Sequence, residues 1–483
     1  MTPVESRQAV VDRLTALFTM WGAEQAIQFE GRWWSWGDVG AVYSALTNVL
    51  CERSTSDDVP VAIVMRQRPA LVASELAVLA VGRTAVLLAP LQPDAALASD
   101  LVGLKAGVLI AHTVDWDRPG FGVAVNQSCA LGLEITDNFE LRVRVDGDSA
   151  TVCDVIDAAV TVMSSGTTGP PKRLPVAWET FVQLGGGPVG QTARSGRGAV
   201  ILSLPLTTLG GLLSMSRLVF GGRPLSMMER FDVRSWAALV KEHRPKVIGA
   251  PPPVVSMILD ANISSDHFEG VTAYMTSSAP VAPEIAAEFE RRYGIPVLLG
   301  YGATEFLNSV TGWTGELYER YGPAKLGSVG RALAGVKLRV VDGILEVDPP
   351  QRANGLPAGW LRTNDRAHID DDGFVWILGR ADDVIIRGGF KVDLGQVEAA
   401  LLSYPSVKEA FAVGLPDERL GDVPGALVVA DSTNPPTESE LIEWLRERLK
   451  PYEIPVRIGV VDEIPATTTF KRNRAEARRL LTE

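Results

Sequence analysis

Cysteine and histidine are scarce in this sequence, and their scarcity excludes several kinds of site. The 483 residues include three cysteines and four histidines. Cys51, Cys129 and Cys153 form no CxxC pair and match no metal-ligand spacing, so neither a disulfide framework nor a zinc site is predicted. A sparse, odd set of cysteines is typical of a reducing compartment, and we expect small buried side chains rather than a catalytic thiol.

Long apolar runs are also missing. The longest apolar stretch, at 71–91, is interrupted by Glu75 and Arg83 and is too short between these charges to span a bilayer. The N-terminus has no basic start followed by an apolar run, so no signal peptide is evident. The net charge of −12 argues against nucleic acid or an anionic membrane as the main partner. These absences predict a cytoplasmic protein without a transmembrane segment.

The chain is long enough for more than one domain, and its apolar segments predict an α/β fold. A single hydrophobic core stops growing at roughly 250–300 residues, and this chain has 483. Short β-branched runs bounded by turn residues predict buried strands at 61–65, 84–88, 108–111 and 247–250. Helical patterns between them cover 69–80, 235–243 and 283–293. Strands that alternate with helices are typical of mainly parallel sheets flanked by helices.

A smaller α+β domain is predicted at the C-terminal end. A glycine- and proline-rich cluster at 349–359 precedes a polar, turn-rich stretch at 363–373 and a short strand at 374–378. Beyond Asp382 the pattern becomes strand, helix, two strands and helix, at 384–386, 395–403, 409–415, 425–430 and 438–449. About a hundred residues of this kind suffice for a small domain. We therefore predict a large domain at 1–381 and a small domain at 382–483.

A run of hydroxyl residues and glycines follows a β-like segment at 161–163. The run offers hydroxyl and backbone N–H donors, and its glycines allow a polyphosphate to approach closely. Its spacing differs from the GxxxxGK[ST] loop of P-loop nucleotide hydrolases. Taken alone, such a run is more often a plain surface turn. It consists of Ser164, Ser165, Gly166, Thr167, Thr168, Gly169, Pro170, Pro171 and the positively charged Lys172.

This run, S-S-G-T-T-G-P-P-K, resembles the phosphate loop of the adenylate-forming superfamily, which includes acyl-CoA synthetases and the adenylation domains of nonribosomal peptide synthetases. Two further motifs follow in the family's order. Thr276-Ser277-Ser278-Ala279-Pro280 is similar to the family's adenine-contacting strand end, and Tyr301-Gly302-Ala303-Thr304-Glu305 matches its Y-G-x-T-E motif. The resemblance implies that both segments bind ATP: Tyr301 flanks the adenine, Thr304 contacts a phosphate and Glu305 helps to hold Mg²⁺. A carboxylate is the ligand type that this hard cation prefers.

Four later residues match functional positions of the family. Asp365 stands where an aspartate binds the ribose hydroxyls, and Arg380 where an arginine reaches the ribose or a phosphate. Asp382 stands at the hinge about which the family's small C-terminal domain moves. Lys471, six residues after Pro465, corresponds to the catalytic lysine. The resemblance therefore implies a mobile domain that begins at the hinge.

Paired glycines follow the hinge. Gly388 and Gly389 lie in the run R-G-G-F-K-V, which is more similar to acyl-CoA synthetases than to peptide adenylation domains. In that context they would allow the narrow pantetheine arm of CoA to pass. A tight turn between two strands explains them equally well.

Several residues depart from the family's pattern. Thr208 stands in place of a histidine, and it supplies no charge for an α-ammonium group, which disfavours an α-amino acid as substrate. Arg173, Asn364 and Phe470 replace glycines, and Leu394 replaces a common proline. We expect the acyl pocket to include a segment of small residues that leaves room for a fatty, aryl or alicyclic acid. Its members are Thr207, Thr208, Gly210 and Gly211.

The resemblance implies an ATP- and Mg²⁺-dependent enzyme that makes an acyl-adenylate from a small carboxylic acid and passes the acyl group to CoA. One alternative is transfer to an acyl carrier protein or to an amine. Another is a catalytically silent nucleotide-binding protein, which the replacement of a glycine by Phe470 beside Lys471 suggests. A homodimer is compatible with the sequence, which does not identify the acid.

Overall fold

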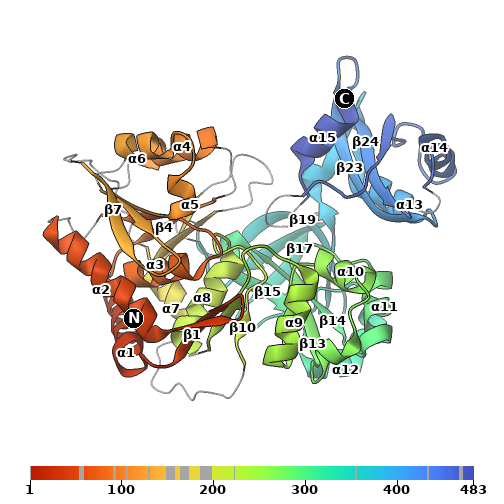
Figure 1. Ribbon diagram of the computed structural model, residues 1–483. Coiled ribbons are helices and arrows are strands. Elements are labelled where there is room, and N and C mark those ends of the chain that lie inside the picture. Colours follow the sequence, from red (N-terminus) through yellow and green to blue (C-terminus); the bar gives the residue numbers. More distant parts are fainter. Residues whose placement is uncertain are drawn as a thin grey trace. The chain divides into compact units, whose positions relative to one another are not determined.

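The computed structural model describes most of the chain. The described residues are 2–53, 59–90, 94–104, 107–128, 131–147, 158–163, 173–184, 198–221, 223–353, 356–431, 435–466 and 472–483. The chain divides into two compact units, Met1–Val310 with Pro350–Pro357 and Thr311–Pro349 with Ala358–Glu483. Figure 1 draws the first unit from red to green and the second from green to blue. The predicted α/β class is confirmed, whereas the boundary at 381/382 falls inside the second unit and stays a prediction.

The first unit contains a mainly parallel sheet with the strand order β7-β6-β5-β3-β4-β8-β9. Its central strands β3, β4, β5, β6 and β8 are parallel, and β7 and β9 pair antiparallel at the two edges. The strands are β3 (Val61–Val64), β4 (Ala85–Leu88), β5 (Val108–His112), β6 (Leu131–Ile135), β7 (Leu141–Asp146), β8 (Val160–Met163) and β9 (Arg173–Val176). The predicted strands at 61–65, 84–88 and 108–111 are therefore confirmed within one or two residues.

Helices cover both faces of this sheet, as buried parallel strands require. α3 lies among α1, α2 and the strands, and all of its residues are buried. α4 and α6 pack on the other face with Leu97, Leu101 and Phe121. The helices of this part are α1 (Pro3–Met20), α2 (Trp36–Glu52), α3 (Pro69–Ala80), α4 (Asp94–Leu104), α5 (Thr113–Trp116) and α6 (Phe121–Ser128). Cys51, predicted to be buried, is instead exposed near the end of α2.

Two smaller sheets complete the first unit. One has the order β10-β11-β1-β2, and the other contains the parallel strands β12, β13 and β14, followed by β15, whose last two residues belong to the second unit. Their strands are β1 (Gln25–Phe29), β2 (Arg32–Ser35), β10 (Val200–Ile201), β11 (Leu225–Met227), β12 (Val247–Gly249), β13 (Ala273–Ser277), β14 (Val297–Ala303) and β15 (Asn308–Gly312). Their helices are α7 (Trp178–Leu184), α8 (Leu209–Gly221), α9 (Val233–His243), α10 (Pro253–Asp260) and α11 (Pro283–Tyr293). An aromatic core of Trp236, Tyr274 and Phe289 packs α9 and α11 against β13.

The second unit begins with an antiparallel sheet of order β17-β18-β19-β20. The elements of this part of the unit are α12 (Gly315–Tyr321), β16 (Arg331–Ala332) and the four strands of the sheet. These strands are β17 (Lys337–Val341), β18 (Ile344–Asp348), β19 (Leu361–Ile369) and β20 (Val375–Arg380). The prediction of a turn-rich stretch at 363–373 is wrong for residues 363–369, because these residues belong to β19. The side chains of this strand are mostly half-buried or exposed, so its sequence is polar and has the composition of a turn.

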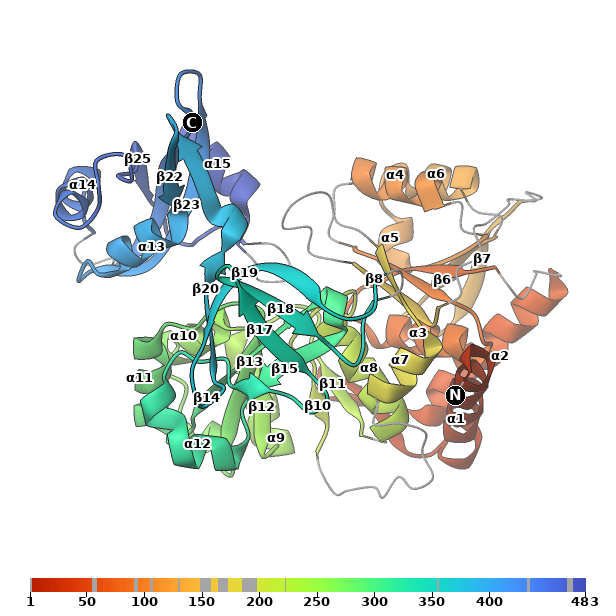
Figure 2. The same ribbon diagram turned by 180° about the vertical axis from the view of Figure 1, so that it is seen from behind.

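A sheet of order β22-β21-β24-β23, with β25 on β24, follows in the second unit. Alternate residues of β23 face opposite sides, so Ala410 and Ala412 pack with α13 and α14, while Phe411 and Val413 pack with α15. The elements are β21 (Val384–Arg387), β22 (Phe390–Asp393), α13 (Leu394–Leu402), β23 (Val407–Asp417), β24 (Gly421–Ala430), α14 (Glu438–Arg446), β25 (Arg457–Val460) and α15 (Arg474–Thr482). Figure 2 shows this layer from behind.

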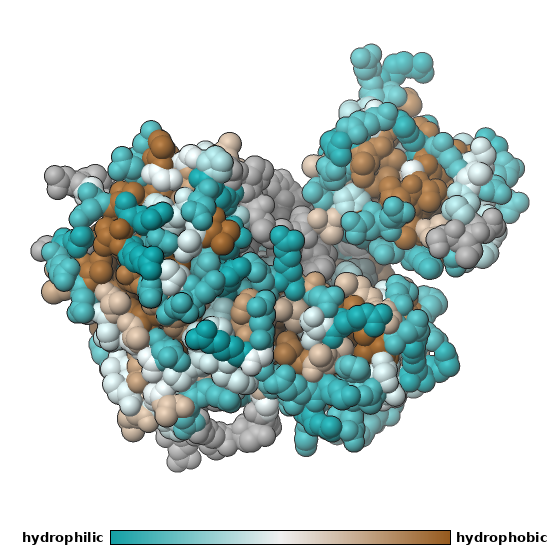
Figure 3. Space-filling view, in the orientation of Figure 1, coloured by the Kyte–Doolittle hydropathy of each residue, from teal (hydrophilic) through white to brown (hydrophobic). Residues whose placement is uncertain are grey.

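The face shown in Figure 3 is largely hydrophilic, with a hydrophobic patch over β23, β24 and α13. Among the described residues, no helix combines the length and apolarity that crossing a membrane requires.

Glu75 is an acidic residue buried in the core of the first unit. Both of its carboxyl oxygens are buried and have no hydrogen-bond partner among the described residues. Burial raises the pKa of Glu75 from 4.5 to about 8. The group is therefore protonated at neutral pH in the folded protein and ionised in the unfolded chain.

This burial predicts that the protein loses stability as pH rises. Because the folded pKa is the higher one, the penalty is absent below about pH 4.5, grows up to about pH 8 and is then constant. Its full size is roughly 4–5 kcal/mol, from about 1.4 kcal/mol per pKa unit. In Glu75→Gln the urea midpoint should fall less between pH 6 and pH 9 than in the wild type. Parallel pH profiles for the two proteins would contradict this account of Glu75.

Candidate active site

The two ends of the predicted phosphate loop are held by neighbouring strands. Residues 164–172 lie outside the described residues, but β8 ends at Met163 and β9 begins at Arg173, and these two residues are paired across the strands. β8 is parallel to β4, so the loop leaves the carboxyl end of a parallel strand, where ligands of α/β sheets bind. Arg173, which replaces a glycine of the family pattern, forms an ion pair with Asp100 of α4 at 2.7 Å.

The segments that hold Ser278 and Tyr301 are brought together by strand pairing. β13 and β14 are parallel, with Thr276 opposite Leu299 and Ser277 opposite Gly300. Ser278, Ala279 and Pro280 therefore follow the carboxyl end of β13, beside Tyr301 and Gly302 near the end of β14. Two motifs that are more than twenty residues apart in the sequence meet at one sheet edge.

The backbone is unusual at both strand ends. Ser278 has φ of +81°, a conformation that glycine adopts readily and other residues rarely do. A Cβ on Gly302 would lie 2.7 Å from the carbonyl oxygen of Asn308, so the close approach of β15 requires glycine there. Strained positions of this kind gather at functional sites. Ser278 was predicted from its motif, but its strain had no signal in the sequence.

Thr304 and Glu305 follow directly in a short 3-10 turn, Thr304–Phe306. The backbone carbonyl of Glu305 accepts a hydrogen bond from the N–H of Ala353 at 2.9 Å, which fixes the turn. The Glu305 side chain is exposed, so its carboxylate is accessible to a ligand. Among the described residues, no group of three His, Cys, Asp or Glu side chains is placed to hold a metal ion.

Asp365 and Arg380 stand opposite each other in the second unit. They form a register pair between β19 and β20, and the Arg380 Nη1 lies 3.7 Å from the Asp365 Oδ1. The hydroxyl of Thr363 accepts a hydrogen bond from the Asp365 N–H at 3.0 Å. A bulge between Arg366 and Ala367 interrupts the pairing just beyond. The two predicted ribose-binding residues are therefore neighbours on one sheet.

The predicted hinge and the predicted CoA face adjoin each other in sequence and fold. Asp382 lies in the 3-10 turn Ala381–Asp383 between β20 and β21. Gly388 and Gly389 form the turn of the β21–β22 hairpin, with φ of +56° and +89°. Positive φ at both positions is what a two-residue hairpin turn requires. The turn by itself explains these glycines, and their contact with CoA stays a prediction.

The predicted acyl-pocket residues lie at the start of α8. Thr208 caps the helix, since its hydroxyl accepts the N–H of Gly211 at 3.3 Å and donates to the carbonyl of Pro205 at 2.7 Å. A Cβ on Gly210 or Gly211 would meet Leu204 or Leu206 at 2.2–2.4 Å. Gly211 is needed because its neighbour is backbone, whereas Gly210 faces the flexible end of the Leu204 side chain. The space beside these two glycines on the Cβ side is thus filled by the preceding chain, and the pocket assignment, Thr207 included, stays a prediction.

Lys471 and Phe470 also lie outside the described residues. The chain is described again from Arg472 onward. The other departures have structural explanations: Asn364 is exposed on β19, and Leu394 begins α13 as a buried core residue.

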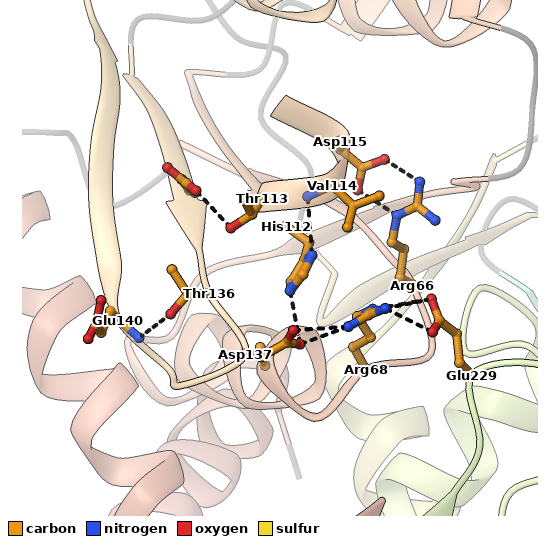
Figure 4. Close-up of polar contacts among 12 residues, drawn as sticks. Arg66, Arg68, His112, Thr113, Val114, Asp115, Thr136, Asp137, Glu140 and Glu229 are labelled. Atoms are coloured by element: carbon orange, nitrogen blue, oxygen red, sulfur yellow. Dashed lines mark hydrogen bonds and ion pairs between the residues drawn. The ribbon is translucent and has the colours of Figure 1, made fainter. Parts of the chain in front are cut away.

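A charged network at the carboxyl ends of β3 and β5 was not predicted (Figure 4). Arg66 donates two hydrogen bonds to the fully buried Asp115, at 2.7 and 2.8 Å. Arg68 bridges Asp137 at 2.9 Å and Glu229 at 2.8 Å. These acids compensate the charge of the arginines, so the network is structural. The sequence feature that could have indicated this network is the pair Arg66-x-Arg68 directly after a buried strand.

His112 completes the network. Its Nδ1 accepts the N–H of Val114 at 3.3 Å, which places the proton on Nε2. The Nε2 then donates to Asp137 at 3.0 Å. The ring thus caps the start of α5, directly after β5, and links it to Asp137, which follows β6.

The network predicts a contrast between two aspartates. Asp115→Asn should lower the free energy of unfolding by roughly 3 kcal/mol, because it removes the buried carboxylate to which the partly buried Arg66 donates two hydrogen bonds. Asp137→Asn should cost less than about 1 kcal/mol, because this carboxylate is 60% exposed. Urea unfolding of both variants measures the difference, and equal losses would contradict the assignment.

Comparison with known proteins is consistent with this arrangement. Residues 16–355 match the family model described as AMP-binding enzyme, and residues 396–471 match that of the AMP-binding enzyme C-terminal domain. A 2-succinylbenzoate–CoA ligase of Bacillus pumilus is 26% identical over 482 residues, with 94% of this chain and 95% of the relative covered. One of Geobacillus kaustophilus is 29% identical, covering 70% and 72%.

Solved structures share the fold. The o-succinylbenzoate CoA synthetase from Bacillus subtilis, in complex with its acyl-adenylate intermediate, superposes with a TM-score of 0.76 at 22% identity, covering 97% of each chain. An ATP-bound MatB from Rhodopseudomonas palustris gives 0.78 at 23% identity, covering 97% and 98%.

Proposed function

Because this chain belongs to the AMP-binding enzyme family, we propose that it activates a carboxylic acid with ATP and transfers the acyl group to the thiol of CoA. The observation that supports this most is the meeting of Ser278–Pro280 with Tyr301–Glu305 at the paired ends of β13 and β14. An aromatic side chain, a hydroxyl and an exposed carboxylate thus follow one another at the carboxyl edge of a parallel sheet. Those are the groups that a nucleotide and its metal ion require.

In the first step, a carboxylate oxygen of the acid attacks the α-phosphorus of ATP. The bond from that phosphorus to the bridging oxygen breaks, and pyrophosphate leaves with the electron pair. Both reactants are anions, so charge neutralisation and alignment dominate catalysis. Lys172 and Lys471 would supply positive charge, and Thr304 a hydroxyl donor to the phosphate.

Mg²⁺ fits the carboxylate of Glu305. This ion is usually held by one or two carboxylates together with substrate phosphates and water, and not by a cage of protein ligands. The exposed side chain of Glu305 meets this requirement. When bound, Mg²⁺ would withdraw charge from the phosphate oxygens.

In the second step, the thiol attacks the acyl carbon, and AMP leaves with the oxygen that came from the acid. The acyl-adenylate is a mixed anhydride and must be shielded from water until the thiol arrives. We propose that residues 382–483 form a mobile domain that turns at Asp382 between the two steps. The Gly388–Gly389 turn would then border the path of the pantetheine arm.

The acid itself is best sought among the substrates of the similar ligases. 2-Succinylbenzoate is the first candidate, because it appears in the names of relatives that are 26–29% identical to this chain. Aryl and aliphatic acids complete the panel. A homodimer and a carrier-protein acceptor stay alternatives that the sequence leaves open, and the cytoplasmic location stays a prediction.

The activity predicts acid-dependent exchange of labelled pyrophosphate into ATP. At least one acid of the panel, with 2-succinylbenzoate tested first, should support exchange and, with CoA present, form a thioester seen by mass spectrometry. Exchange without thioester would favour a carrier-protein or amine acceptor. ATP binding without exchange for any acid would favour the catalytically silent alternative and contradict the proposal.

The two steps should depend differently on Lys471. Lys471→Ala removes a charge that the proposal uses in the first step only, so exchange should fall by at least about 100-fold. Thioester formation from supplied acyl-adenylate and CoA should stay within a few-fold of the wild type. Equal losses in both half-reactions would contradict the assigned role.

A further inference from the structure

The segment directly after Lys471 is tied to distant parts of the C-terminal layer. Arg472 donates to the Glu398 Oε2 at 2.9 Å, and Arg474 pairs with Asp383. Ala466 and Arg472 form an antiparallel bridge, and the N–H of Asn473 donates to the carbonyl of Pro465 at 2.7 Å. The residues on the two sides of 467–471 are therefore hydrogen-bonded to each other, and two arginines tie them to the rest of the layer.

The two acceptors are themselves fixed. Glu398 projects from α13, and its Oε1 accepts the N–H of Ala412 in β23 at 2.9 Å. Asp383 is the residue after the predicted hinge residue, Asp382. Both guanidinium groups also lie over the buried ring of Phe411, 5.3 and 5.9 Å from its centre. The cluster thus joins the hinge, α13, β23 and the segment after Lys471.

These pairs differ from the ordinary ion pairs of this layer. Arg446 pairs with Glu443 and Arg479 with Glu476, each three residues away on the exposed face of its own helix. Arg472 and Arg474 instead reach partners 74 and 91 residues away. Long-range pairs of this kind set where a segment lies, whereas pairs within one helix only support that helix.

The two arginine pairs lie next to Lys471 in the sequence, and they can therefore affect where this lysine is placed. Lys471, itself outside the described residues, directly precedes Arg472 in the sequence. A lysine side chain is long and flexible, and the position of its backbone decides which oxyanion the ammonium group meets. A misplacement of about 1 Å in a catalytic group can cost about 100-fold in rate.

We propose that Glu398 and Asp383 are positioning residues, which act through Arg472 and Arg474 to place Lys471 for adenylate formation. This inference rests on the proposed function, because it takes Lys471 as the catalytic lysine of the first step. It extends that function to four charged residues of the C-terminal layer. Since Lys471 serves only the first step, the effect of these residues belongs to that step as well.

The test compares half-reactions in Glu398→Gln, an isosteric change that keeps an acceptor for the Ala412 N–H. Acid-dependent pyrophosphate exchange should fall by about 10- to 100-fold. Thioester formation from supplied acyl-adenylate and CoA should stay within about twofold of the wild type. The matched control is Glu443→Gln, which breaks an exposed pair of the same layer and should leave both rates unchanged.

A double variant separates positioning from a general structural role. If Glu398 acts through Lys471, then Glu398→Gln together with Lys471→Ala should lose no more exchange than Lys471→Ala alone. Further loss in the double variant, or equal loss in both half-reactions of Glu398→Gln, would overturn the inference. If Glu398→Gln fails to fold, Asp383→Asn carries the same test with the same outcomes.

Failure of the inference and failure of the proposed function are distinguishable. A wild-type protein without exchange for any acid would refute the proposed function. A wild type with exchange, and a Glu398→Gln variant that matches it in both half-reactions, would refute only the positioning role.

Discussion

The parallel pairing of strands in the first unit is the constraint on which the rest of the site depends. Parallel strands place all their carboxyl ends at one edge, and their apolar side chains are buried only when helices cover both faces. Residues 164–172 follow β8, Ser278 follows β13, and Thr304 follows β14. Segments that are far apart in the sequence thus lie at the carboxyl edges of two parallel sheets. The pairing of the strands is enough to place them there, and no direct contact between the motifs is needed.

Much of this arrangement could be predicted from the sequence. Buried parallel strands are short, apolar and β-branched, so β3, β4, β5 and β12 were predicted within one or two residues, and α3 and α11 exactly at their ends. The antiparallel sheet β17–β20 was harder. Its strands are partly exposed on both faces, and a polar segment such as Thr363–Asp365 has the composition of a turn although it lies in β19.

The meaning of small residues could not be predicted, because residue type does not reveal what lies beside it. Gly210 and Gly211 were interpreted as open space, yet the chain at 204–206 packs against them. Gly388 and Gly389 are required by a hairpin turn. The anchor of the lysine segment had no local signal either, since Arg472 and Glu398 are 74 residues apart. Such pairs become visible only when the strands and helices are placed in space.

The central claim is that the phosphate chemistry of this protein releases AMP. The most direct measurement is the identity of the nucleotide formed from ATP, by chromatography, when an accepted acid and CoA are both present. The account predicts AMP and pyrophosphate in amounts equal to the thioester formed. ADP and inorganic phosphate formed together with the thioester would contradict it.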